Sequence, residues 1–113
     1  MSERPVKLIL QDMLDAIYGI ENFIAGMSEN DYKKDEKTQA SVERYLEILG
    51  EASNKLPEEF YLLHEHIQWH RIISLRNRII HAYFDVNNSI VWNVITQFLP
   101  GLKNDLQKLL NNL

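Results

Sequence analysis

The chain contains no cysteine, which excludes disulfide bridges and thiolate metal sites and agrees with a reducing compartment. It also lacks any run of about 18 uncharged apolar residues, the length that a membrane-spanning helix needs. The first residues, MSERPVKLILQDML, place charges on both sides of a short apolar run and offer no small-residue cleavage site, so no signal peptide is indicated. We therefore expect a cytoplasmic protein with no membrane segment.

Signals for β-strands are scarce as well. The sequence shows no sustained alternation of apolar and polar residues and no Asn-Gly or Asp-Gly pair for a hairpin turn. Its 45% hydrophobic and 25% charged residues are ordinary for a folded soluble protein. The 113 residues fit a single domain, 1–113, with a thin core. Any apolar surface left uncovered would favour a homodimer.

Helical periodicity is strong in the first half of the chain. Apolar residues at three- and four-residue spacing predict a helix over about 5–26: Leu10, Met13, Ile17, Ile20, Ile24 and Met27. The polar stretch 28–37 is predicted to be a loop or a frayed helix start. A second helix over about 38–55 turns a set of mostly apolar residues inward: Val42, Tyr45, Leu46, Leu49, Ala52, Ser53 and Leu56. Pro57 ends it, and PEEFYLL fits a short helical turn.

Two further helices are predicted in the second half. The third runs from about 67 to 81 or 83, and DVNNS after it has turn and N-cap chemistry in Asp85, Asn87, Asn88 and Ser89. The last turns Val91, Val94, Ile95, Phe98, Leu102, Leu106 and Leu109 to one side. Pro100 predicts a kink or break in it near Leu99. The fold class is therefore all-α, an up-and-down bundle of four main helices.

The charge distribution singles out the third helix. The net charge is −4, yet residues 66–84 contain no Asp or Glu, while Arg71, Arg76 and Arg78 lie among them. A local positive field can attract a polyanion even on an acidic protein. The alternative is a helix whose charges are basic by chance.

Residues 69–84 read WHRIISLRNRIIHAYF and carry the chemistry. At about 100° per residue on a helix, Arg76 and Tyr83 share one stripe, and Asn77 and His81 share the next. Asn77 is placed to orient the imidazole, and Arg78 points away.

RNA cleavage without a metal needs a base for the 2′-hydroxyl, an acid for the leaving 5′-oxygen and a cation for the phosphorane. Histidine and arginine supply these groups, and tyrosine can bind the phosphate or stack on a base. Two copies would provide acid and base together.

The pattern Arg76-x4-His81-x-Tyr83, with Asn77 directly after the arginine, is similar to the Arg-x4-6-His-x-Tyr signature of HEPN domains. Four segments extend the resemblance over most of the chain: DMLDAIYGIENFIAG, RYLEILGEASNKLP, WHRIISLRNRIIHAYF and IVWNVITQFLPGLKNDL. The chain as a whole resembles the HepT-like toxins of HEPN/MNT toxin–antitoxin pairs.

The resemblance implies an all-α dimer that cleaves RNA without a metal or other cofactor, with the motif of both subunits lining a cleft at their interface. Such a protein is the toxin of a type II toxin–antitoxin system. An MNT-type nucleotidyltransferase antitoxin neutralises it and can transfer AMP to the motif tyrosine, here Tyr83. By position, Arg76 and His81 carry over as catalytic, and Asn77, Arg78 and Tyr83 as supporting or RNA-binding residues.

Other interpretations remain open from the residues alone. The motif side chains could serve only the fold, or the chain could be a catalytically silent helical module that binds the nucleotidyltransferase or a nucleotide. His66 and His70, four residues apart, could approach a metal, but we predict no metal site because this spacing is common by chance. Glu43, Glu47 and Glu51 form either a solvated face or a docking surface for a basic antitoxin. Gly50 costs its helix about 1 kcal/mol relative to alanine, so we expect close helix packing there, near the cleft and Glu51.

Overall fold

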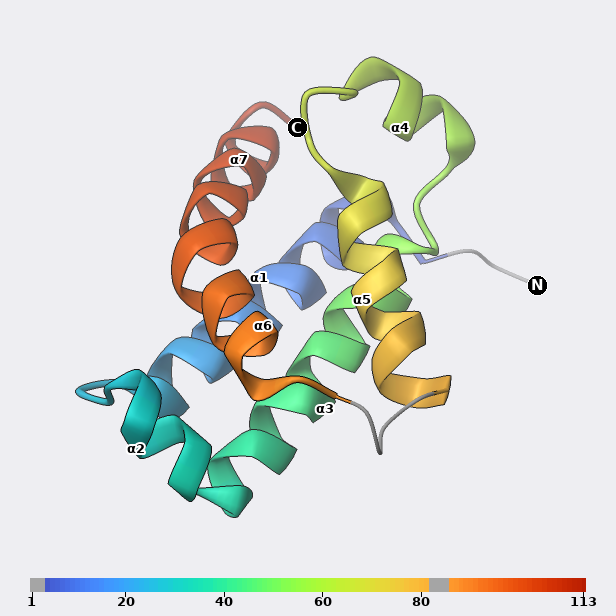
Figure 1. The fold of residues 1–113 in the computed structure, drawn as a ribbon. Coiled ribbons are helices and arrows are strands. Elements are labelled where there is room, and N and C mark those ends of the chain that lie inside the picture. Colours follow the sequence, from blue (N-terminus) through green and yellow to red (C-terminus); the bar gives the residue numbers. More distant parts are fainter. Residues whose placement is uncertain (1–3, 82–85) are drawn as a thin grey trace.

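Helices make up all the regular structure in the part of the chain that the computed structural model describes, residues 4–81 and 86–113. In chain order they are α1 (Val6–Ile24), α2 (Glu29–Lys34), α3 (Glu36–Ser53), α4 (Glu58–Leu63), α5 (Trp69–His81), α6 (Asn88–Asn93), the π-helical segment η2 (Val94–Phe98) and α7 (Leu99–Asn111). The prediction of an all-α fold with four main helices is confirmed, with α6, η2 and α7 together forming the fourth (Figure 1).

The core lies where α3 packs against both α1 and α5 and where α7 covers α1 (Figure 1). Many of its buried side chains come from the predicted apolar faces: Leu10, Met13, Ile17 and Ile20 of α1, Val42, Leu46 and Leu49 of α3, and Leu102 and Leu106 of α7. Burying a side chain of this size contributes about 1.5–3 kcal/mol. Among the described residues, no helix combines the length and apolar character required to cross a membrane.

The polar stretch after α1 is a helix rather than the predicted loop. The Ser28 hydroxyl accepts a hydrogen bond from the Asp31 N–H at 3.1 Å, and the Asp31 carboxylate accepts one from the Ser28 N–H at 3.0 Å. This reciprocal capping box satisfies two backbone donors that would otherwise be free at the start of α2. At the start of α3 the Asp35 carboxylate accepts a hydrogen bond from the Thr38 N–H, a one-way cap. These short-range signals are present in the sequence, but the polar composition of the segment conceals them.

The irregularity in the last helix lies where Pro100 predicts it, but the helix does not break. The Leu99 N–H donates to the Val94 carbonyl, five residues earlier, and α6, η2 and α7 follow one another without a loop. In an uninterrupted α-helix the Pro100 ring would clash with the carbonyl of Thr96. The wider π-helical turn relieves this conflict, and Pro100 falls in the first turn of α7, where its missing N–H is tolerated.

Replacing glycine by alanine is expected to have opposite effects on the free energy of unfolding at two positions. At Gly101 an added Cβ meets no heavy atom within 4 Å, so Gly101→Ala is expected to raise the free energy of unfolding by about 0.5–1 kcal/mol through helix propensity. Gly26 has an equally open surrounding but a φ of 77°, and Gly26→Ala is expected to lower stability by about 1–2 kcal/mol. Urea unfolding of both variants measures the two effects, and equal signs would contradict this prediction.

Candidate functional site

The rotation of α5 about its own axis is set by its buried side. Ile72 and Ile79 lie in the core, 3% and 5% exposed. Trp69 is buried at the start of the helix, and its Nε1–H donates to the His64 carbonyl at 3.0 Å. With this side fixed against the bundle, the opposite side of α5 faces outward. Arg76, Asn77, Arg78 and His81 therefore project from a helix packed on the bundle rather than from a loop.

Gly50 allows α5 to approach α3 closely at Arg76. A Cβ built on Gly50 would lie 2.2 Å from the Arg76 Cβ and 2.6 Å from its Cγ. Neither distance is possible in a folded protein, so any other residue at position 50 would push the two helices apart. The predicted close packing at Gly50 is thus confirmed, and its partner is the stem of Arg76.

The Arg76 guanidinium is held from two sides. Its Nη1 donates to the Asn77 side-chain oxygen at 2.9 Å, and its Nη2 lies 3.6 Å from the Glu51 carboxylate. The side chain is only 28% exposed, and its Nε is buried with no hydrogen-bond partner among the described residues. The described contacts thus involve one partner at each Nη atom, whereas a guanidinium has five N–H donors in all. The ion pair is partly solvated, so it orients Arg76 more than it stabilises the fold.

His81 is the last described residue of α5 and is exposed to solvent. The Asn77 side-chain oxygen accepts its hydrogen bond from the Arg76 guanidinium, and not from His81 as the helix spacing predicts. Arg78 is exposed and points away from Arg76, as predicted. Tyr83 and Asp85 lie outside the described residues.

The acidic row on α3 is not a uniform solvated face. Glu47 pairs with Arg44 at 3.2 Å, and Glu51 pairs with Arg76. Partial burial raises the pKa of Glu43 above its usual range. Of the three carboxylates, Glu51 is the one that contacts the motif arginine.

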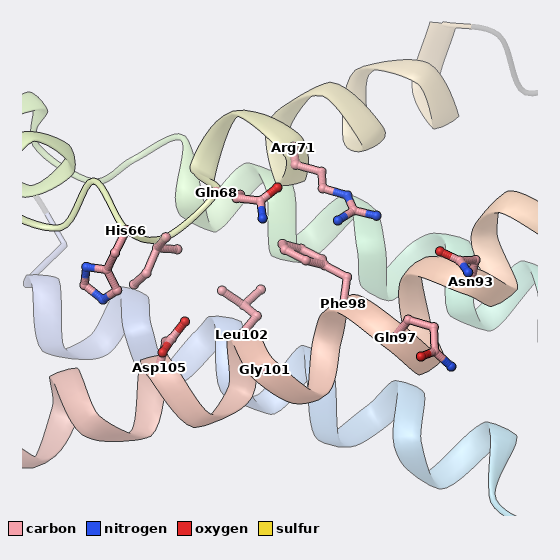
Figure 2. A pocket seen from close by; sticks show the side chains of 10 residues that line it. His66, Gln68, Arg71, Asn93, Gln97, Phe98, Gly101, Leu102 and Asp105 are labelled. Atoms are coloured by element: carbon pink, nitrogen blue, oxygen red, sulfur yellow. The ribbon is translucent and has the colours of Figure 1, made fainter.

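Sequence reasoning missed a cavity on the other flank of α5. It lies between the first turn of α5 and the η2–α7 region (Figure 2). Its volume is about 430 Å³. The Arg71 guanidinium lies over the Phe98 ring, 4.5 Å from its centroid. Its other lining residues are five polar side chains, His66, Gln68, Asn93, Gln97 and Asp105, together with Ile67, Gly101 and Leu102. The one sequence feature that pointed to this region is the absence of Asp and Glu from residues 66–84, which include Arg71.

Metal ligands do not gather in the described part of the chain. Across residues 4–81 and 86–113, no group of three or more His, Cys, Asp or Glu side chains converges on a point. His64 and His66 approach each other edge to face, with ring centroids 6.1 Å apart.

Comparison with known proteins agrees with this picture. A family model described as "Ribonuclease HepT-like" matches residues 13–109. "Probable ribonuclease HepT" of Thermococcus cleftensis is 39% identical over 107 residues, covering 95% of this chain and 97% of the relative. A Methanocaldococcus jannaschii protein named "Putative RNase" is 31% identical over 113 residues, covering 100% of this chain and 93% of the relative. No solved structure matches. This chain belongs to the HepT-like ribonuclease family.

Proposed function

We propose that this protein is a metal-independent endoribonuclease that acts as the toxin of a type II toxin–antitoxin system. The observation that carries the proposal is the environment of Arg76. Its stem lies against Gly50, Glu51 and Asn77 hold its guanidinium, and donors are left over for a phosphate. An exposed imidazole, His81, ends the same helix. The names of the relatives, which are ribonucleases, support RNA as the substrate.

The geometry of α5 favours a site shared between two copies. His81 follows Arg76 by five positions, which puts their side chains about 140° apart around the helix. In one chain, therefore, the Arg76 guanidinium and the His81 imidazole do not lie on the same side of α5. Beside α5, Leu62 and Leu63 of α4 are 64% and 74% exposed, an apolar surface that a second copy could cover. A dimer formed on this side would bring two guanidinium and two imidazole groups to one cleft.

In such a cleft the roles divide by chemistry. His81 of one copy accepts the proton of the RNA 2′-hydroxyl, and the 2′-oxygen attacks the neighbouring phosphorus. The bond from phosphorus to the 5′-oxygen breaks, and His81 of the other copy protonates that oxygen. Arg76 steadies the charge that builds on the phosphorane. Asn77 and Glu51 are positioning residues, since they act through Arg76.

Tyr83 is the proposed point of control. It follows His81 by two residues, so AMP transferred to it by an MNT-type nucleotidyltransferase antitoxin would add bulk and negative charge beside the imidazole. RNA, itself a polyanion, would then be excluded. The intact mass of the protein co-expressed with its antitoxin would show this modification directly.

A subunit-mixing experiment tests the shared site. Wild-type protein and His81→Ala protein are unfolded together, refolded at equal amounts and assayed for RNA cleavage with a chelator present. If each site needs both subunits, only wild-type pairs are active, and the activity falls to about one quarter of the wild-type value. An activity of about one half would show that each subunit cuts RNA alone. Loss of wild-type cleavage on adding chelator would contradict a metal-independent mechanism.

The second candidate is the catalytically silent module that binds the nucleotidyltransferase or a nucleotide. The exposed positions of Asn77, Arg78 and His81 suit binding as well as catalysis. Wild-type and His81→Ala proteins that both leave RNA intact, while remaining folded, would favour this module over the nuclease.

A further inference from the structure

The outward side of α5 is basic and polar along its whole length. Its exposed residues are His70, Arg71, Ser74, Asn77, Arg78 and His81. Arg71 and Arg78 are seven residues apart, so they lie within about 20° of each other around the helix. They line the flank of α5 opposite to Arg76, with His81 between the two flanks. No carboxylate of α5 interrupts this surface, because residues 66–84 contain neither Asp nor Glu.

The cavity of Figure 2 opens at one end of this surface, and Arg71 belongs to both. Its composition differs from that of a phosphate site. Arg71 is its one permanently charged cation, while the Asp105 carboxylate would repel a phosphate placed deep inside. The apolar part of the lining consists of the flat Phe98 ring and the side chains of Ile67 and Leu102. The carboxamides of Gln68, Asn93 and Gln97 can both donate and accept hydrogen bonds.

These are the features with which proteins hold an unstacked nucleobase. A base needs an aromatic or guanidinium plane on its face and donors and acceptors at its edge. A carboxylate such as that of Asp105 accepts from an exocyclic amino group. The volume of about 430 Å³ is within the range of small-ligand sites.

We propose that this flank of α5 is a substrate subsite separate from the motif: Arg71 and Arg78 bind phosphates of a single-stranded RNA, and the cavity takes one of its nucleobases. The inference rests on the proposed function in its choice of RNA, and it adds a second point of contact. The strand would then be held at the cavity and cut near His81, several residues further along the same rigid helix. The proposed subsite would thereby fix the distance from the bound base to the cleavage point.

Gly101 offers a direct way to block the cavity. It lines the cavity, and a Cβ added there meets open space, so Gly101→Leu adds bulk at the cavity wall without a clash at its Cβ. Gly101→Ala is the matched control, since it makes the same change of backbone propensity with little added volume. Arg44→Ala is the control for charge, because Arg44 is an exposed arginine on α3 that pairs with Glu47.

Binding of a short fluorescent single-stranded RNA of mixed sequence tests the inference. All variants are made in the His81→Ala protein so that the RNA stays intact. Arg71→Ala and Arg78→Ala are each expected to weaken binding about tenfold, the effect of one charge-assisted hydrogen bond. Each should lower the slope of log affinity against log salt by about 0.7. Gly101→Leu should weaken binding without changing this slope, and Gly101→Ala and Arg44→Ala should bind nearly as the parent does.

Two results would overturn the subsite. One is binding by Arg71→Ala and Arg78→Ala that equals binding by Arg44→Ala, and the other is binding by Gly101→Leu that equals binding by Gly101→Ala. Arg71→Lys guards against a folding effect, because it keeps the charge, and with it the salt slope, even if packing on Phe98 changes. Cleavage is measured separately in proteins with His81 intact. RNA that binds at the subsite but is never cut would reject the nuclease proposal. If the protein cuts RNA but its RNA binding is unaffected by the substitutions at Arg71, Arg78 and Gly101, only the subsite is rejected.

Discussion

His81→Ala is expected to reduce the rate of RNA cleavage by about 10²–10⁴-fold, the usual contribution of a general acid or base. The side chain is exposed at the last position of α5, outside the core formed by the buried apolar residues. Surface substitutions of this kind change stability by about 0.5 kcal/mol or less. The loss should therefore appear in the rate of cleavage and not in the folded fraction.

Cleavage of a defined RNA in the presence of a chelator measures this effect, together with urea unfolding of the same preparations. The matched control is His64→Ala, since His64 lies beside the end of α4 and packs on Phe60, 4.5 Å between ring centroids. It should retain most of the activity. Equal cleavage by His81→Ala and wild-type protein would remove His81 from the chemistry. Equal losses in both histidine variants would point to a general disturbance instead.

Gly50→Ala is expected to lower both stability and activity, although alanine is normally the better helix former. The methyl group would have to occupy space within 2.2 Å of the Arg76 Cβ. Forcing such a contact in a packed interface costs about 1–3 kcal/mol, more than the gain of about 1 kcal/mol in helix propensity. Because α5 must move or Arg76 must turn, the guanidinium shifts from its place, and a displacement of about 1 Å can cost a factor of about 10² in rate.

Urea unfolding and cleavage assays of Gly50→Ala measure the two losses. Gly101→Ala is the matched glycine control, because its Cβ enters open space and should stabilise the protein. Adding Arg76→Gly removes the colliding atoms, so the double variant should recover stability relative to Gly50→Ala but not activity. A Gly50→Ala protein as stable and as active as the wild type would show that the contact between α3 and α5 does not position Arg76.

Much of the fold follows from local sequence. The three- and four-residue spacing of apolar residues identifies the buried face of each of the helices α1, α3, α5 and α7, because helix periodicity depends only on neighbours along the chain. Pro100 marks the irregular segment for the same reason, although the π-helical turn of η2 shows that the chain can absorb a proline without breaking. The helix α2 was missed because its capping box, Ser28 to Asp31, lies in a segment too polar to show a buried face.

The features of the site can also be separated into those that local sequence specifies and those that depend on the tertiary structure. The residue order Arg76, Asn77, His81 and the absence of acidic residues around them are properties of the sequence. The tertiary structure decided the rest: the stem of Arg76 lies on Gly50, its guanidinium pairs with Glu51, and Arg71 covers Phe98 beside a cavity. Each of these contacts joins segments more than 20 residues apart. Their geometry depends on how α3, α5 and α7 pack on one another, which no local pattern specifies.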